Sequence, residues 1–163
     1  MPRILATNEM NPVSFQPKTR NRFVLMIDGI QAFTLKTCKL PSVSTTTQKI
    51  DHINTYFKYQ GKAEWEDISF TTYDPINPSA SQQVIEWFRQ GYETLTGRAG
   101  YPDFYKKDIK IQILGPVGDV VSEWSILGAF IQAVDFGEAD WSDDGSPLEI
   151  NVTLSIDRAI LEY

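Results

Sequence analysis

Apolar and polar residues alternate in several segments of the chain, which is the period of a β-strand. The alternation is most regular from Leu148 to Asp157, where every second side chain is apolar and the residues between are polar. Residues 64–73 and 108–113 have the same period. A strand of this kind buries one face and exposes the other. The pattern therefore predicts a mainly β protein.

Near the beginning of the chain, two β-prone runs, 22–27 and 30–38, are separated by Asp28-Gly29. An Asp-Gly pair suits a tight hairpin turn, because that turn needs positive φ angles. We expect these two runs to pair with each other.

A second hairpin is predicted about Gly128, which separates the apolar runs 120–127 and 129–136. It brings the expected total to about seven or eight strands. No internal repeat is visible, so residues 1–163 are expected to form a single domain. The predicted fold class is mainly β: a β-sandwich or partly open barrel with long loops between strands.

One segment has helical periodicity. Ser79 and Gln82 fit an S-x-x-Q capping box, which marks the beginning of a helix. We therefore predict one helix over about residues 79–95, packed against the sheets. The apolar residues that follow the cap fall on one helical face: Val84, Ile85, Phe88, Tyr92 and Leu95.

Two segments have no clear period. Residues 1–21, rich in Asn, Pro and Thr, predict an N-terminal arm, and residues 44–60 predict a long loop, although 44–47 could form an edge strand. Aromatic residues on such a loop favour a protein interface. The alternative, that they pack on the core of their own chain, fits the sequence equally well. The loop aromatics are Tyr56, Phe57 and Tyr59.

Charge is unevenly distributed along the chain. The formal net charge is −6, but residues 1–40 hold six basic and two acidic side chains, whereas residues 119–163 hold one basic and ten acidic. An acidic chain is poorly suited to grip phosphates. Opposite charges at the two ends of the sequence would favour head-to-tail contact between copies.

Catalysis finds little support in the composition. His52 is the only histidine and Cys38 the only cysteine, so a Ser-His-Asp or Cys-His arrangement would need His52, which lies in the predicted loop. Lysines beside Cys38 could lower its thiol pKa, but a partly buried small apolar residue is its more ordinary role. A Walker A loop is also absent. We expect no enzyme and no cofactor.

One acidic segment approaches a metal-binding motif. Asp140, Ser142, Asp144 and Gly145 stand at positions 1, 3, 5 and 6 of a calcium loop. Position 12 is Asn151 instead of the bidentate Glu, and strands replace the flanking helices. The sequence therefore predicts an acidic turn that binds no metal.

Features of export and membrane insertion are missing from the sequence. No apolar stretch approaches the roughly 20 residues that a membrane span needs, and residues 1–7 contain no apolar signal core. The single cysteine cannot form an internal disulfide, which suits a reducing cytoplasm. No membrane association is expected.

Segments along nearly the whole chain resemble the tail tube protein family of contractile-tailed bacteriophages. The resemblance lies in their order and spacing, and no single piece is diagnostic. The arm before Phe23 is longer than the family pattern. The segments are Phe23–Ile27, Lys36–Pro41, Trp65–Phe70, Val84–Phe88, Tyr105–Lys107, Gly128–Phe130, Asp140–Ser142 and Ile150–Asp157.

The resemblance implies a structural subunit of a contractile tail. Six-fold rings would join their sheets into one inner β-barrel and stack head to tail into a hollow tube that conducts the genome during ejection. The implied partners are other copies of the chain, a tail sheath protein, baseplate and tail terminator proteins, and a tape-measure protein and DNA that pass through the lumen without tight binding. The implied location is the virion tail, assembled in the host cytoplasm.

Candidate residues follow for two surfaces of such a tube. The predicted lumen-lining residues are Glu64 and Glu66, since an acidic lumen would repel DNA. Two other functions remain open: a tube subunit of a phage-like bacteriocin, type VI or other contractile injection system, and a monomeric β-sandwich that binds carbohydrate. The predicted inter-ring contacts are His52, Tyr56, Phe57 and Tyr59.

Overall fold

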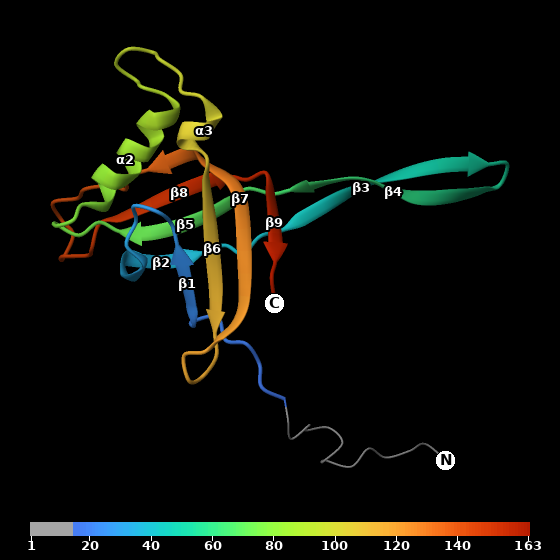
Figure 1. Ribbon diagram of the computed structural model, residues 1–163, viewed down its shortest axis with the longest axis horizontal. Helices are drawn as coiled ribbons and strands as arrows, with labels where there is room; N and C mark the ends of the chain where they lie inside the picture. The colour runs from blue at the N-terminus through green and yellow to red at the C-terminus, as the bar shows by residue number, and fades with distance from the viewer. Residues whose placement is uncertain (1–14) are drawn as a thin grey trace.

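The computed structural model describes residues 15–163, which form a mainly β fold with one main helix, as the sequence predicts (Figure 1). The first 14 residues of the predicted arm lie outside this range. The elements are β1 (Phe23–Met26), η1 (Ala32–Thr34), β2 (Leu35–Cys38), β3 (Val43–His52), β4 (Thr55–Trp65), β5 (Ile68–Tyr73), α2 (Ala80–Gly91), α3 (Pro102–Tyr105), β6 (Lys107–Leu114), β7 (Val120–Asp135), β8 (Glu149–Ser155) and β9 (Arg158–Leu161).

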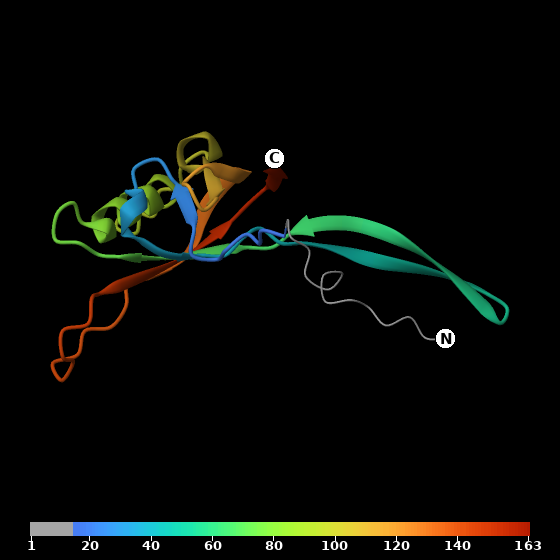
Figure 2. The ribbon, with the colours of Figure 1, turned by 90° about the horizontal axis from the view of Figure 1, so that it is seen from below.

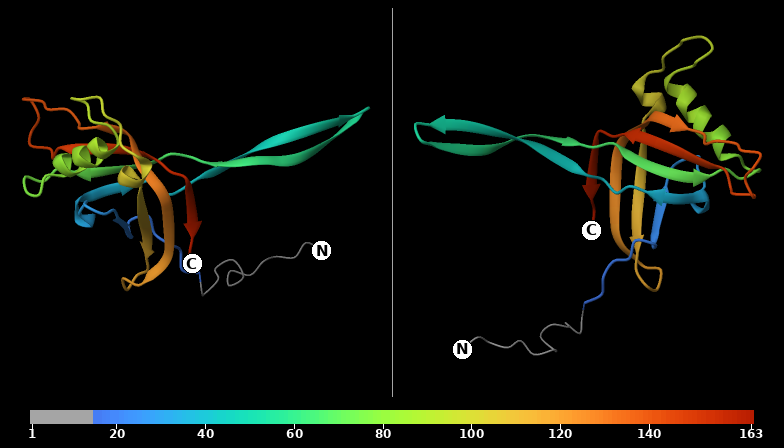
Figure 3. Two further views of the ribbon diagram at one scale, coloured as in Figure 1. Left: turned by 45° about the horizontal axis from the view of Figure 1, so that its top comes forward. Right: turned by 180° about the vertical axis from the view of Figure 1, so that it is seen from behind.

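Seven strands form one antiparallel sheet in the order β1-β6-β7-β8-β5-β2, with β9 also paired to β7 (Figure 3). The end strands β1 and β2 do not pair with each other, so the sheet does not close into a barrel. β3 and β4 form a separate two-stranded sheet. Residues 15–163 contain nine strands instead of the expected seven or eight: the two strands of the hairpin and the short β9 are additional, whereas the two strands expected in 120–136 are the single strand β7.

The predicted hairpin about Gly128 is wrong. β7 continues through Gly128 for 16 residues: its first part pairs with β6 and β9, and its last part pairs with β8. Gly128 has φ +68°, which lets the strand bend without reversing, and its N–H donates to Asp108 Oδ1 at 3.2 Å. One strand therefore connects the two halves of the sheet, because each part finds its own partner strands.

The turn at Asp28-Gly29 is present, but the hairpin predicted around it is wrong. The N–H of Ile30 donates to the carbonyl oxygen of Ile27 at 3.2 Å, and Gly29 has φ +88°. Beyond this bridge the chain separates, and β1 pairs with β6 while β2 pairs with β5. β1 places Leu25 opposite Ile111, and both are buried, so apolar burial against β6 determines its pairing.

The core follows the predicted two-residue period. In β5 and β8 the inward residues are almost fully buried, whereas Leu148 at the edge of β8 is exposed. Each fully buried aliphatic or aromatic side chain contributes about 1.5–3 kcal/mol. The inward residues of these strands and of β6 are Ile68, Phe70, Thr72, Ile109, Ile111, Ile150, Val152 and Leu154.

The helix begins as predicted and ends earlier. The side chain of Ser79 accepts from the N–H of Gln82 at 3.4 Å, which confirms the cap. α2 ends at Gly91, after which Tyr92 takes an extended backbone and lies exposed with Leu95. The predicted apolar face is thus partly wrong, because its last two members lie beyond the helix. The fully buried face is Ala80, Val84 and Trp87.

The predicted loop 44–60 is wrong: this segment is most of a β-hairpin, β3–β4, whose two strands are joined at residues 53–54. Thr and aromatic residues favour extended structure. Both faces of the hairpin are exposed, so no burial pattern in the sequence reveals it.

Candidate assembly surfaces

The β3–β4 hairpin projects away from the rest of the molecule (Figure 2). Every residue of β3 is exposed, and in β4 only Gly61 and Trp65 are partly covered. A two-stranded hairpin without a packed face is marginally stable in water. The hairpin is therefore a surface that a partner would stabilise.

One face of the hairpin is apolar near its tip. Ile50 pairs with Phe57, and Gln48 pairs with Tyr59, so these four side chains share a face. The rings of Phe57 and Tyr59 stack with centroids 6.5 Å apart. Large apolar side chains left in solvent at such a tip are typical of an interaction site.

The opposite face of the hairpin is charged. Lys49 pairs with Lys58, and Asp51 pairs with Tyr56. Lys49 Nζ lies 2.8 Å from Asp51 Oδ1, and both lysines lie over the ring of Tyr56, with Nζ 5.0 and 5.3 Å from its centroid. The hairpin thus has two faces of different chemistry.

The four predicted inter-ring residues all lie on this hairpin, but the structure divides them. Phe57 and Tyr59 lie together with His52 on the apolar face, whereas Tyr56 lies on the charged face. The possibility that the aromatics pack on their own core is contradicted, because Tyr56, Phe57 and Tyr59 are 56%, 59% and 47% exposed. In an extended strand residue 56 faces the opposite side from residues 57 and 59, so the sequence positions could have separated Tyr56 from the other two aromatics.

The two predicted lumen residues do not form a pair. Glu64 lies on the hairpin opposite Ser44. Glu66 lies between β4 and β5, where Ser42 Oγ donates to its carboxylate at 2.6 Å and Lys39 Nζ lies 3.4 Å away. The hydrogen bond from Ser42, with the help of Lys39, lowers the pKa of Glu66.

A broad polar face lies on the side of the sheet opposite the core. Across β5 and β8 the facing pairs are Ser69 with Thr153 and Thr71 with Asn151. Thr71 Oγ1 donates to Asn151 Oδ1 at 2.7 Å. Hydroxyl and amide groups occupy the centre of this face, and charged groups lie at its margin: Asp135 opposite Asn151, and Glu149, which pairs with Lys36. It is the polar second face that the alternation of residues 148–157 predicts.

Between the open ends of the sheet lies a groove of about 790 Å³, here named the basic groove. Its floor includes Ile111, Ile113 and Phe23. Lys36 pairs with Glu149 and Lys39 with Glu66. Lys18 and Arg20 are exposed, and no carboxylate of residues 15–163 lies within ion-pair distance of them. The cations that line the groove are Lys18, Arg20, Lys36 and Lys39.

Residues 136–148 connect β7 to β8 and form what we name the Trp141 loop, which projects at the end of the molecule away from the hairpin (Figure 2). The loop has four acidic side chains, at Glu138, Asp140, Asp143 and Asp144, and no basic one. The side chain of Trp141 is 105% exposed. Four of the ten acidic side chains of residues 119–163 thus lie in the loop that carries the exposed Trp141 indole.

The carboxylates of this loop bind its own backbone. Asp140 Oδ1 accepts from the N–H of Ser142 at 2.9 Å, and Asp143 Oδ1 accepts from the N–H groups of Gly145 and Ser146 at 3.0 and 2.8 Å. These backbone hydrogen bonds lower the pKa of both carboxyls. Within residues 15–163 no group of three His, Cys, Asp or Glu side chains is arranged to hold a metal ion.

The candidate nucleophile and base are in separate sheets. His52 ends β3 on the hairpin, and Cys38 ends β2 in the main sheet. Burial raises the pKa of the Cys38 thiol to about 12, which disfavours the reactive thiolate. The structure does not bring the two residues together into a catalytic arrangement.

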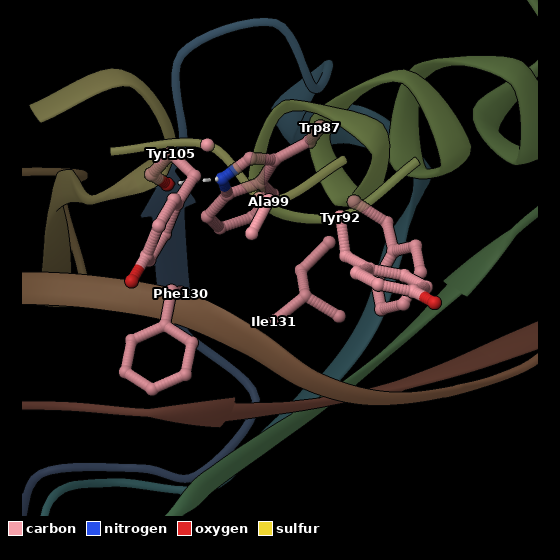
Figure 4. A pocket seen from close by; sticks show the side chains of 9 residues that line it. Trp87, Tyr92, Ala99, Tyr105, Phe130 and Ile131 are labelled. Carbon is pink, nitrogen blue, oxygen red and sulfur yellow. Dashed lines mark hydrogen bonds between the residues drawn. The ribbon is translucent and has the colours of Figure 1, made fainter. Parts of the chain in front are cut away.

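A cavity of about 260 Å³ lies between α2, α3 and β7 (Figure 4). Trp87 Nε1 donates to the carbonyl oxygen of Tyr105 at 2.7 Å, and the ring of Tyr105 meets that of Phe130 edge-on at 5.7 Å. The lining has no carboxylate, histidine, lysine or cysteine. The hydrogen bond and the ring contact anchor α2 and its following loop to β7, and the titratable side chains of the lining are the phenols of Tyr92 and Tyr105.

Among the described residues, no helix has the length and apolar character to cross a membrane.

No protein-family model matches the chain, and no curated protein matches it. Solved structures do share its fold. The tube terminating cap of the anti-feeding prophage aligns with a TM-score of 0.75 and 18% identity over 96% of this chain and 99% of that chain. A chain of the PVC extracellular contractile injection system, in its sheath-tube complex in the extended state, aligns with a TM-score of 0.72 and 17% identity over 98% and 99%.

A more distant likeness is to Hcp1 from Flavobacterium johnsoniae, with a TM-score of 0.54 and 12% identity over 86% of this chain and 94% of that chain. In each of these proteins the likeness extends over most of both chains, so it concerns the whole fold and not a shared motif. The chain therefore has the fold of tube and tube-terminator components of contractile injection systems, which supports the fold implied by the sequence resemblance.

Proposed function

We propose that this chain is a structural, non-catalytic subunit of the tube of a contractile tail or injection machine. The observation that carries the proposal is the β3–β4 hairpin, which leaves both faces in solvent in a fold similar to tube and terminator components. Copies of the chain stack through this hairpin, and its apolar face with Phe57 and Tyr59 forms the centre of the contact between rings.

The polar face of β5 and β8 lines the lumen in this proposal. At its centre are hydroxyls and amides such as Thr71 and Asn151, which carry no positive charge to bind the phosphates of a passing nucleic acid, and the nearby Lys36 is paired with Glu149. Glu64 and Glu66 remain predicted lumen residues. A sheath protein outside the tube and a baseplate at its end are the proposed partners.

Two machines use such a tube. In a phage tail it conducts DNA and surrounds a tape-measure protein, in six-fold rings within a virion. The alternative is the tube of a phage-like bacteriocin, type VI or other contractile injection system. The sequence resemblance favours the phage tail, whereas the named similar structures are an anti-feeding prophage and an extracellular injection system. The genes beside this one, for a capsid or for toxins, distinguish them.

A tube terminator is the second candidate, because the terminating cap aligns over 96% of this chain. Negative-stain electron microscopy of the purified full chain tests both. Long tubes support the tube subunit, and single rings that do not extend support the terminator. A monomer at every concentration, above all one that binds glycans, would contradict both and favour the carbohydrate-binding alternative.

A further inference from the structure

We propose that the Trp141 loop of one copy docks in the basic groove of a second copy. This inference rests on the proposed assembly of the chain and names two surfaces that meet in it. Charge complementarity carries the argument: the loop has four acidic and no basic side chains, and the groove is lined by four cations, of which Lys18 and Arg20 have no carboxylate partner among residues 15–163. The two surfaces are different patches, so the contact repeats from copy to copy in one direction.

The groove has the chemistry to receive an indole with carboxylates around it. Its floor is apolar, with Phe23, Ile111 and Ile113, and its volume of about 790 Å³ is within the range of sites that enclose a bulky group. On its rim, Lys18 and Arg20 are exposed cations without a carboxylate partner among residues 15–163. The docked loop supplies those partners.

The loop has the form of a preorganised anchor. Trp141 is fully exposed, and tryptophan is among the residues that most often dominate the energy of an interface. The hydrogen bonds that the loop backbone donates to the carboxylates of Asp140 and Asp143 hold the shape of the loop before contact. Little conformational entropy is then lost on docking.

The hairpin of a second copy is a poorer occupant of the groove. Residues 43–65 carry three lysines and two carboxylates, so the hairpin has the same sign of charge as the groove. Like charges brought together oppose association. The Trp141 loop is therefore the better occupant of the groove, and the hairpin makes its contact at another surface.

Cross-linking of the purified full chain tests the contact. In a Cys38→Ser background, Ala139→Cys and Asn21→Cys place one thiol on the loop and one on the groove, and Trp141 is kept. A short bismaleimide should then give a ladder of covalent oligomers, because each copy offers both partners. Each single-cysteine variant should give dimers at most. The matched control replaces the loop thiol by Leu95→Cys, at an exposed site on another loop, and should give no ladder.

Charge reversal provides a second readout. Glu138→Lys with Asp144→Lys leaves the two backbone-bonded carboxylates in place and should raise the concentration needed for assembly about tenfold or more. Lys18→Glu with Arg20→Glu should do the same, and the combined protein should recover assembly. If wild-type protein assembles but neither ladder nor recovery is seen, the docking inference is overturned and the proposed function stands. If wild-type protein never assembles, the proposed function fails and the inference with it.

Discussion

Gly128 and Asp157 are in direct contact at the bend of β7: a Cβ on Gly128 would overlap the carboxylate of Asp157. That carboxylate is also held by Lys106, whose Nζ lies 2.8 Å from Oδ2. Gly128 itself has φ +68°. A glycine is therefore favoured at position 128 for two reasons: it tolerates the positive φ, and it leaves room for Asp157 where the two halves of the sheet join.

Gly128→Ala should lower the free energy of unfolding by about 2–3 kcal/mol, from the left-handed backbone and the overlap with Asp157 together. Gly118→Ala is the matched control, because Gly118 has φ +87° and no atom within 4 Å of its added Cβ. Gly118→Ala should lower the free energy of unfolding only by the cost of placing alanine in the left-handed backbone conformation, about 1–2 kcal/mol. Urea denaturation measures both. Equal losses would show that Asp157 does not restrict the position.

The anchor of α2 is Trp87, not the centre of the face predicted from sequence. Trp87→Ala should cost about 3–5 kcal/mol, because the side chain is 3% exposed. Trp87→Phe should cost about 1–3 kcal/mol, since the carbonyl of Tyr105 loses its donor. Phe88→Ala should cost less than Trp87→Ala, because Phe88 is only partly buried. Urea denaturation measures these free energies of unfolding. A larger loss in Phe88→Ala than in Trp87→Ala would show that Trp87 is not the main anchor of α2.

Asp74 caps α2 from outside the predicted capping box. Burial alone would raise the pKa of its carboxyl, but hydrogen bonds from Ser81, Ser79 and Ala80 outweigh burial and bring the pKa below the ordinary 3.8. The carboxylate therefore stabilises the fold above its ordinary pKa, and this stabilisation is lost as the pH falls through the lower folded value.

Asp74→Asn should cost about 1 kcal/mol at neutral pH. The difference from wild type should shrink as the pH falls to about 3 and below, where the wild-type carboxyl is protonated in the unfolded chain and then in the folded one. Thermal unfolding across this range measures it. The control is Asp67→Asn, an exposed carboxylate, which should leave stability near wild type at every pH. A pH-independent loss in Asp74→Asn would contradict the capping role.

The two faces of the hairpin should contribute unequally to assembly. Phe57→Ser removes a side chain from the apolar face and should abolish extension into tubes while the melting temperature stays unchanged, because the Phe57 side chain is 59% exposed and lies outside the core. Tyr56→Ser, its neighbour on the charged face, is the matched control and should retain tubes. Electron microscopy reads the outcome, and tubes from both variants would exclude the apolar face as the stacking surface.

Metal removal should leave the protein unchanged. The carboxylates of Asp140 and Asp143 already accept hydrogen bonds from the loop backbone, so a cation would have to displace them. Neither a chelator nor added calcium should shift the melting temperature or dissolve assemblies. A calcium-dependent rise in melting temperature that Asp143→Asn removes would restore the calcium-loop hypothesis.

Local sequence patterns were enough to predict the strand and the helix that bury one face and expose the other. The alternation in residues 148–157 predicts β8 with its buried face, and Ser79 marks the beginning of α2. These features depend on neighbours in sequence, because a side chain's face is determined by the strand or helix period. For the aromatic residues 56, 57 and 59 the sequence fitted an exposed surface and a packed core equally well, and only the structure shows that they are exposed.

Tertiary structure decided everything that depends on which segments meet. β7 continues through Gly128 because its first part pairs with β9 and its last part pairs with β8. At Asp28-Gly29 the chain makes a turn, but the strands on either side pair with β6 and β5 and not with each other. The groove combines residues 18–23 and 36–40 with β6, segments that lie far apart in the sequence. Such pairings are settled by the apolar area that distant segments bury together, and no local period of a single chain records that area.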